Sequence, residues 1–211
     1  MTTRRSKPSR RVEIPAESAA ALDGRKQRSQ QSQRRIVEAM LELVAAGNIS
    51  PSAEQVATRA GVGLRSVFRH FKDMDGLYGE MQQVLAARLE NVARQPFVAA
   101  NWPGQMLELV GRRAAAFETM APFLRAAQAH RHRSEVLRAG HARFAATLRR
   151  ILVERLAGGQ VRDKRLVETV DLLLSFEAWQ RLRDTQKLSA AEAKAVLADA
   201  VRALLGIAGG T

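Results

Sequence analysis

The stretch SAEQVATRAGVGLRSVFRHF, residues 52–71, constrains the fold of this chain more than any other part of it. Ser50 or Ser52 can cap a helix here, and Gln55 follows Ser52 at the three-residue spacing of a capping box. Gly61 can adopt the positive φ angle that a sharp turn requires, and a second short helical pattern follows it. Two short helices joined by a turn with a glycine are typical of a helix-turn-helix motif.

Small and apolar residues indicate how the two helices pack against each other. Val56 and Ala57 lie on the inner side of the first helix, where a small side chain lets two helices cross closely. Val62 anchors the turn, and Val67 and Phe71 face inward at i and i+4. The alternative is an ordinary corner between two helices of an all-helical bundle.

The outward face of the second helix is basic. Arg65 lies near its N-terminal end, the part of a recognition helix that reaches base edges in the major groove. A guanidinium there can bond guanine O6 and N7, or it can contact a phosphate, and both alternatives stay open. Ser66 can bond a phosphate or a base, and Arg69 is assigned a phosphate contact or a solvated charge.

The remaining pattern predicts an all-α fold. Apolar residues recur at helical spacing along most of the chain, and no stretch alternates with the period of a strand. Asp73 stands where the N-cap of a long helix belongs. A helix is predicted between the cap at Ser50 or Ser52 and Gly61, and others at residues 30–46, 64–71, 74–92, 104–120, 122–130, 134–156, 163–187 and 189–205.

The net charge of +13 over 211 residues favours an anionic partner such as nucleic acid or a membrane surface. Residues 1–35 hold ten basic against three acidic residues, and residues 80–211 carry a further +7. We predict that residues 1–29 form a basic flexible arm, which is either a solvated tail or a segment that follows DNA phosphates.

Several function classes find no support in the sequence. The chain has no cysteine, and His130 and His132 are spaced so that a helix would point them apart, so no metal site is predicted. No phosphate-binding loop or nucleophile elbow occurs, and we expect neither an enzyme nor a resident cofactor. No apolar run approaches the ~20 residues of a membrane span. We therefore expect a cytoplasmic protein without membrane contact.

The segments RRIVEAMLELVAAG and SAEQVATRAGVGLRSVFRHFKDMDGLY, within residues 34–78, resemble the DNA-binding domain of the TetR family of bacterial transcriptional regulators. That family's pattern runs IAxxAGVSxGTLYxHFxxKxxL. The best-preserved positions are Val56, Ala57, Ala60, Gly61, Val62, His70, Phe71 and Leu77. The resemblance implies a homodimer whose N-terminal domain, residues 30–79, binds double-stranded DNA near the nucleoid, and whose helical domain, residues 80–211, binds a small ligand and dimerises.

Four positions depart from the family's pattern. Gly63 replaces the usual Ser and weakens the cap of the recognition helix, whereas Arg65 replaces the usual Gly and adds a charge. Phe68 and Met74 replace a Tyr and a Lys, which removes two possible phosphate contacts. The candidate DNA-binding residues are Arg34, Ser52, Gly63, Leu64, Arg65, Ser66, Phe68, Arg69, His70 and Lys72.

The resemblance also implies a ligand cavity among the middle helices, although plain core packing is the alternative for each bulky residue there. The candidate lining residues are Trp102, Met106, Phe117, Met120, Phe123, Phe144, Phe176 and Trp179. Glu177 could bind a cationic ligand, pair with an arginine across an interface, or face water. The apolar stripes of helices 163–187 and 189–205 predict pairing with a second copy, unless they only complete a monomer core.

Together these features predict a sequence-specific, ligand-responsive transcriptional repressor that binds a palindromic operator as a homodimer. The effector would be a small molecule that the sequence does not identify. One alternative is a non-specific or architectural nucleic-acid-binding protein attracted by charge. Another is a helical enzyme or carrier that retains a DNA-binding domain, against which Arg65, Arg69 and His70 argue.

Overall fold

A computed structural model gives the fold, and it describes the backbone of residues 16–207 and the side chains of residues 24–207. Within this part the chain is helical without a strand, which confirms the all-α prediction. The elements are α1 (Ala16–Ala45), α2 (Ala53–Ala60), α3 (Leu64–His70), α4 (Met74–Ala93), α5 (Trp102–His130), α6 (Glu135–Gly158), α7 (Lys164–Leu173), α8 (Phe176–Gln180), the π-helical turn η1 (Arg181–Thr185) and α9 (Ala190–Leu205).

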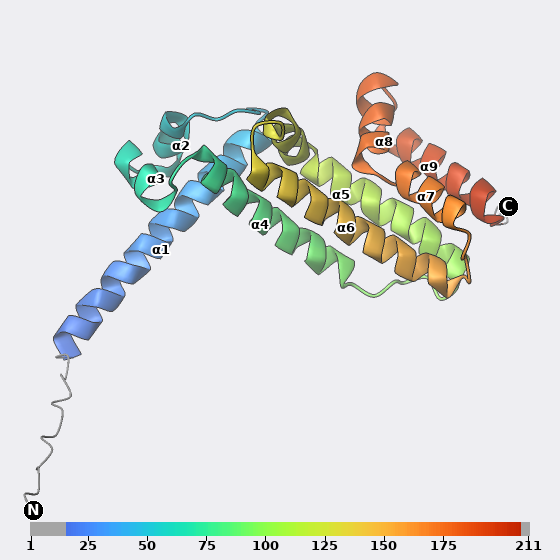
Figure 1. Cartoon of the computed structure of the whole chain (residues 1–211), viewed down its shortest axis with the longest axis horizontal. Helices are drawn as coiled ribbons and strands as arrows, with labels where there is room; N and C mark the ends of the chain where they lie inside the picture. The colour runs from blue at the N-terminus through green and yellow to red at the C-terminus, as the bar shows by residue number, and fades with distance from the viewer. Residues whose placement is uncertain (1–15, 208–211) are drawn as a thin grey trace, which may run out of the picture.

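The molecule is elongated, and two buried clusters lie one after the other along it (Figure 1). The first cluster joins α1–α4 to the adjoining ends of α5 and α6. The second lies among α5, α6, α7, α8 and α9. Because α4, α5 and α6 extend through the middle of the molecule, these three helices connect the two ends. The predicted domain boundary after residue 79 stays a prediction, since α4 runs through it without a break.

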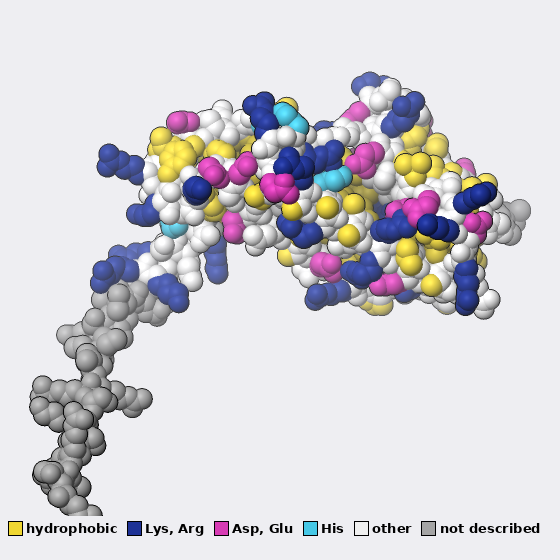
Figure 2. Space-filling view, viewed as in Figure 1, with side chains coloured by type: hydrophobic (Ala, Val, Ile, Leu, Met, Phe, Trp, Pro, Cys, Tyr) yellow, Lys and Arg dark blue, Asp and Glu magenta, His cyan; other side chains and the backbone are white. Residues whose placement is uncertain are grey.

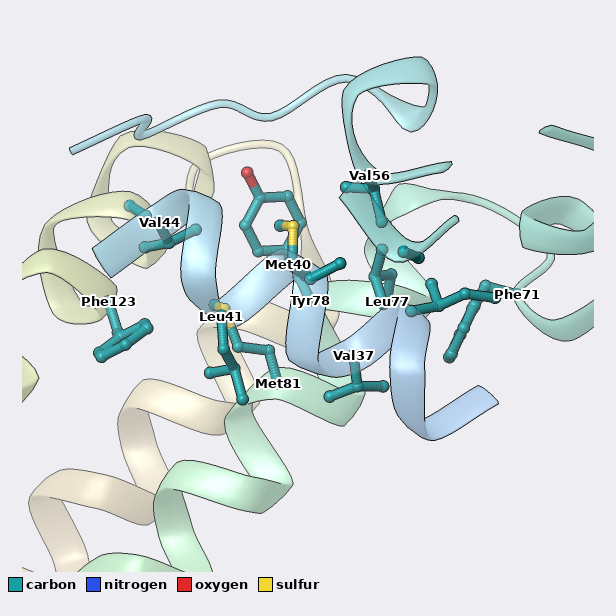
Figure 3. Close-up of a cluster of buried hydrophobic side chains, with 14 of the residues drawn as sticks. Val37, Met40, Leu41, Val44, Val56, Phe71, Leu77, Tyr78, Met81 and Phe123 are labelled. Carbon is teal, nitrogen blue, oxygen red and sulfur yellow. The ribbon is translucent and has the colours of Figure 1, made fainter. Parts of the chain in front are cut away.

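The first cluster forms around one apolar stripe of α1. Ile36, Met40 and Val44 are fully buried, as their i, i+4, i+8 spacing predicts. They belong to the same buried cluster as Leu77 and Met81 of α4, and Figure 3 shows Met40, Leu77 and Met81 within that cluster. The stripe therefore packs α1 against α4. We call these two packed helices, on which the α2–α3 unit rests, the platform.

Local capping chemistry explains most of the helix starts. Ser52 and Ser189 form complete capping boxes with Gln55 and Glu192, and Ser52 rather than Ser50 is the cap of α2. The Asp73 carboxylate accepts a hydrogen bond from the Gly76 amide at 2.9 Å, which confirms the predicted cap of α4.

The prediction that the first helix starts at Gln30 was wrong, because α1 already begins at Ala16. The segment AESAAAL is rich in alanine, the strongest helix former, although residues 25–31 remain exposed. Residues 16–29 of the predicted arm are therefore helical, and residues 1–15 lie outside the described part.

Two further predicted boundaries were also wrong. Pro122 lies inside one continuous helix α5, because its neighbours Ala121 and Phe123 are buried on either side and tertiary packing outweighs the hydrogen bond that proline cannot make. Conversely, the predicted helix 163–187 breaks after Leu174, where the Ser175 hydroxyl accepts from the Ala178 amide at 3.2 Å and starts α8. A serine inside an apolar helical run was the signal for this break.

Replacing Leu77 by alanine tests the packing of α1 on α4. Leu77 is fully buried between the two helices, so Leu77→Ala should lower the free energy of unfolding by about 2–5 kcal/mol in urea denaturation. The control Val98→Ala changes a side chain that is 91% exposed and should stay within about 0.5 kcal/mol of wild type. Equal effects of the two substitutions would contradict this account of the core.

Candidate nucleic-acid interface and inner cavity

The turn between α2 and α3 has the geometry that the sequence predicts. Gly61 takes φ 62° and ψ 42°, the left-handed region that only glycine enters without strain. The buried Val56, Ala57 and Val67 hold the two short helices together on the α1 platform. The result is a helix-turn-helix unit whose α3 has one buried face and one exposed face.

Arg35 of α1 holds this turn in place through hydrogen bonds, a role that the sequence did not reveal. Its guanidinium donates to the Ala60 carbonyl and, at 3.1 Å, to the Gly61 carbonyl. These carbonyls lie at the C-terminal end of α2, where a cation is favourable because backbone acceptors have no helical partner. Arg35 is therefore a positioning residue for α3, and its neighbour Arg34 is exposed.

The predicted DNA-binding residues lie at this end of the molecule, exposed or half-buried, with none in the core. Figure 2 shows lysine and arginine side chains around it, with others over the C-terminal helices. Arg65, Arg69 and Lys72 are exposed, and Phe68 keeps 48% of its surface accessible although it is apolar. Exposed Leu64 and half-buried Ser66 complete the outer face of α3.

Of the predicted DNA-binding residues, Ser52 has a structural role that competes with contact to DNA, whereas Gly63 has no capping role. The Ser52 hydroxyl accepts from the Gln55 amide at 3.2 Å, although its hydrogen is still available to donate. Gly63 provides no side-chain cap to α3, as its replacement of serine predicts.

His70 stays half-buried, and its Nε2 lacks a hydrogen-bond partner among the described residues. Burial, followed by the charge of Arg69, lowers the pKa of His70, so the ring is neutral at pH 7. In this rotamer Nε2 is closed to solvent, and a contact with phosphate through it would require the ring to turn.

A cavity of about 350 Å³ lies between α4, α5, α6 and the start of α8. Of the predicted pocket residues, the structure brings four to it: Met120, Phe123, Phe144 and Phe176. The other four lie elsewhere. Met106 and Phe117 are core residues, the Trp102 indole donates to the Arg155 carbonyl at 2.7 Å, and the Trp179 indole donates to Glu118 at 3.0 Å.

Polar groups also line the cavity, and the sequence analysis missed the deepest of them. Arg113 is 4% exposed and donates from Nη1 to the Leu174 carbonyl at 2.6 Å and from Nη2 to the Leu148 carbonyl. Leu174 is the C-cap residue that follows α7, where carbonyls have no partner within the helix. No periodicity signal distinguishes such an arginine from a solvated one.

Three acidic residues line the cavity, each beside a basic group, and the least exposed of them, Asp171, accepts from Arg149 at 2.8 Å. Glu177 is 4.0 Å from His141, and Glu90 is 3.4 Å from Arg150. The Glu177 carboxylate is half exposed, in agreement with a residue that faces water. Burial and the charge of Arg131 lower the pKa of His141 more than Glu177 raises it.

The C-terminal helices α7 and α9 expose apolar side chains. Leu172 of α7 is 69% exposed, and Val196 and Leu204 of α9 are exposed as well.

No group of histidine, cysteine and acidic residues within the described part could hold a metal ion. Among the described helices, none is long and apolar enough to cross a membrane.

Replacing Gly61 by alanine tests the turn. An alanine at φ 62° is strained by about 1–2 kcal/mol, and its Cβ would lie 2.8 Å from the Arg35 guanidinium. Gly61→Ala should therefore lower the midpoint of urea unfolding. In the control Gly76→Ala, the new methyl meets only ordinary contact with Asp73 within a helix, and stability should hold or rise by up to about 1 kcal/mol. A stable Gly61→Ala protein would refute the left-handed turn.

Comparison with known proteins shows which solved structures share this fold. No protein-family model and no curated protein matches the sequence. A crystal structure of a transcriptional regulator from Rhodococcus sp. Rha1 is similar at 15% identity and a TM-score of 0.63, covering 82% of this chain and 96% of that one. A protein from Mesorhizobium loti MAFF303099 described as a TetR-family transcriptional regulator is similar at 17% identity and a TM-score of 0.57, covering 87% and 99%.

The multidrug binding protein EbrR, complexed with ethidium, is similar at 22% identity and a TM-score of 0.57, over 80% of this chain and 97% of that one. Identities this low carry the architecture and no residue's role. The chain has the all-α fold of TetR-family transcriptional regulators.

Proposed function

We propose that this protein is a TetR-family transcriptional regulator that binds a palindromic operator as a homodimer and releases it in response to a small molecule. The observation that carries the proposal is the exposed face of α3, which presents Arg65 and Arg69 on a turn fixed by Gly61 and Arg35. A short basic helix held rigidly at one end of a protein can enter the major groove.

The position of each basic residue along α3 suggests whether it contacts a base or a phosphate. Arg65 lies in the first turn and is exposed, where a guanidinium reaches base edges or a phosphate. Arg69 lies one turn later, and Lys72 follows the helix, so both suit phosphate contacts. Exposed Phe68 offers apolar contact with sugars or a thymine methyl, since it lacks the hydroxyl of tyrosine.

A homodimer is supported by the apolar side chains on α7 and α9, which lie at the opposite end from α3 (Figure 1). A two-fold axis there would present two copies of α3 to successive major grooves, about 34–36 Å apart or a multiple of it. Bound at a promoter, such a dimer acts as a repressor.

The cavity supports ligand control, because it shares residues with the platform of α3. Leu85, Met120 and Phe123 line the cavity and also belong to the buried cluster that holds α1 and α4. A ligand that shifts α4 or α5 therefore shifts the platform of α3 and the spacing between the two recognition helices. That EbrR was crystallised with ethidium agrees with small-molecule binding in this fold.

A non-specific nucleic-acid-binding protein is the second candidate, favoured by the +7 that residues 80–211 carry away from α3. Such a protein would bind all duplexes with similar affinity, and that affinity would fall steeply as the salt concentration rises. A regulator instead retains one palindromic site in the presence of competitor DNA. The proposal includes no catalysis, since the similar structures are described as regulators or binding proteins.

Substitution of Arg65 tests the DNA-binding face. After selection of bound sites from random duplexes, Arg65→Ala should weaken binding to the selected site by about 5- to 150-fold for each half-site, the effect of losing one bidentate base contact per protomer. Relaxed discrimination at one base pair would assign Arg65 to a base, whereas uniform loss with a smaller salt dependence would assign it to a phosphate.

The matched control is Arg88→Ala, which removes an exposed arginine from α4 and should leave DNA binding unchanged. Affinity and discrimination that survive Arg65→Ala unaltered would refute a role for α3 in recognition.

Substitution of Leu172 tests the dimer. Wild-type protein should sediment as a dimer in analytical ultracentrifugation, and Leu172→Asp should raise the dissociation constant at least about tenfold, because it places a charge in an apolar interface. Val98→Asp, an equally polar change at a more exposed valine outside α7 and α9, should leave the dimer intact. A monomeric wild type would exclude this interface.

A further inference from the structure

We propose that the cavity selects an amphiphile that carries one anionic group, bound by Arg113 at the buried end, and an apolar body that lies between α4, α5 and α6. This inference rests on the proposed ligand-responsive function and names the chemical class of the effector. The cavity's position and lining are independent of whether the protein binds DNA.

The buried guanidinium of Arg113 is the first step of the argument. Its two Nη atoms are used by the Leu148 and Leu174 carbonyls, whereas Nε is buried and has no partner among the described residues. Two neutral carbonyls leave the positive charge uncompensated, and a buried charge without a counter-ion is costly. Nε is closed to solvent in this rotamer, so an anion in the cavity would engage the guanidinium after a shift of the side chain or by sharing one of its Nη donors. With that shift, an arginine at the wall of a cavity is suited to a ligand that brings a negative charge.

The protein's own acids do not neutralise Arg113 by contact. No ion pair within the described residues includes Arg113, and Asp171, the acid that acts on it electrostatically, accepts from Arg149 at 2.8 Å. Burial lowers the pKa of Arg113 to about 10, so the guanidinium remains charged at pH 7. Asp171 lines the same cavity, and the other lining acids, Glu90 and Glu177, have basic neighbours of their own. Arg113 is the one charged side chain of the described lining that is buried.

The remaining walls favour hydrocarbon. They consist largely of aliphatic and aromatic side chains from α4, α5, α6 and α8: Leu85, Leu89, Met120, Phe123, Leu124, Phe144, Leu148 and Phe176. A volume of about 350 Å³ lies at the lower end of the roughly 300–1,000 Å³ typical of small-molecule pockets. A polar or polyanionic ligand would leave these walls unmatched, whereas a chain or ring with one charged end matches them.

Gln82 is a further polar residue of the cavity wall, and Gly140 makes room for its side chain. A Cβ at residue 140 would lie 1.9 Å from Gln82 Oε1, so only glycine allows this side chain between α4 and α6. Gln82 Oε1 is buried without a partner among the described residues. Because Oε1 is an acceptor, it cannot bond a carboxylate, so the anionic head group depends on Arg113.

The rival explanation is that Nε of Arg113 is satisfied by water. Arg113 also lines a smaller, apolar cavity of about 30 Å³, which is roughly the volume of one water molecule. In that case Arg113 would have a structural role only, and the large cavity would not distinguish an anion from a neutral molecule of the same length.

Three probes with the same chain and different head groups separate these explanations: decanoate, 1-decanol and decyltrimethylammonium. Isothermal titration calorimetry with the full-length protein should show decanoate binding about 10- to 100-fold more tightly than decanol, the effect of one hydrogen bond to a charged group. The cation should bind more weakly than decanol. Equal affinities, or a preference for the cation, would overturn the proposal with the wild-type protein alone.

Arg113→Met, which retains the length of the side chain without its charge, should abolish the preference for decanoate and leave decanol binding unchanged. Arg143→Met removes an exposed arginine from the rim of the same cavity and should keep the preference. Gly140→Ser should weaken decanoate and decanol alike by displacing Gln82. A preference for decanoate that persists in a folded Arg113→Met protein would reject Arg113 as the anion site.

The outcome of the probe-binding experiment can be distinguished from the outcome of the test of ligand-controlled DNA binding. Decanoate that binds with the expected preference but leaves the occupancy of the selected DNA site unchanged supports the anion site and contradicts ligand control. Specific DNA binding combined with equal affinity for the three probes supports the regulator and contradicts the anionic class of its effector.

Discussion

The contact between α1 and α4 is the constraint on which the rest of the structure depends. Ile36, Met40 and Val44 of α1 pack on Leu77 and Met81 of α4, and all five side chains are fully buried. The same α1 that forms this contact carries the arginine that holds the turn before α3. Because α3 is short and has a single buried anchor, its orientation depends on α1, and that of α1 depends on α4.

The platform and the cavity therefore cannot change independently. α4 faces α1 near its N-terminal end and lines the cavity with Leu85 and Leu89 further along. α5 does the same with Met120 and Phe123. Close-packed cores shift as units rather than deforming locally, so under the proposed function a molecule that enters between α4, α5 and α6 would change the angle at which α3 is presented.

The features that the sequence predicted are those set by neighbours along the chain. The cap at Ser52, the left-handed turn at Gly61 and the cap at Asp73 each need only three or four consecutive residues. The missed features depend on distant partners. Pro122 stays helical because both sides of α5 are packed, and Arg113 is buried because two carbonyls far along the chain converge on it. The helical periodicity likewise identified the bulky inward-facing residues, but it could not distinguish those that line the cavity from those packed in the core.

Arg113 also relates the cavity to the opposite end of the molecule. Its guanidinium bonds the Leu174 carbonyl at the point where α7 ends, and α7 carries the exposed Leu172. An anion on Arg113 weakens or reorients the bond to that carbonyl, because one cation then serves an additional acceptor. Ligand binding would thus act on α4 toward the DNA-binding face and on α7 toward the dimer face. In the proposed two-fold dimer both movements would change the distance between the two copies of α3, so a single buried charge would couple the cavity to both surfaces.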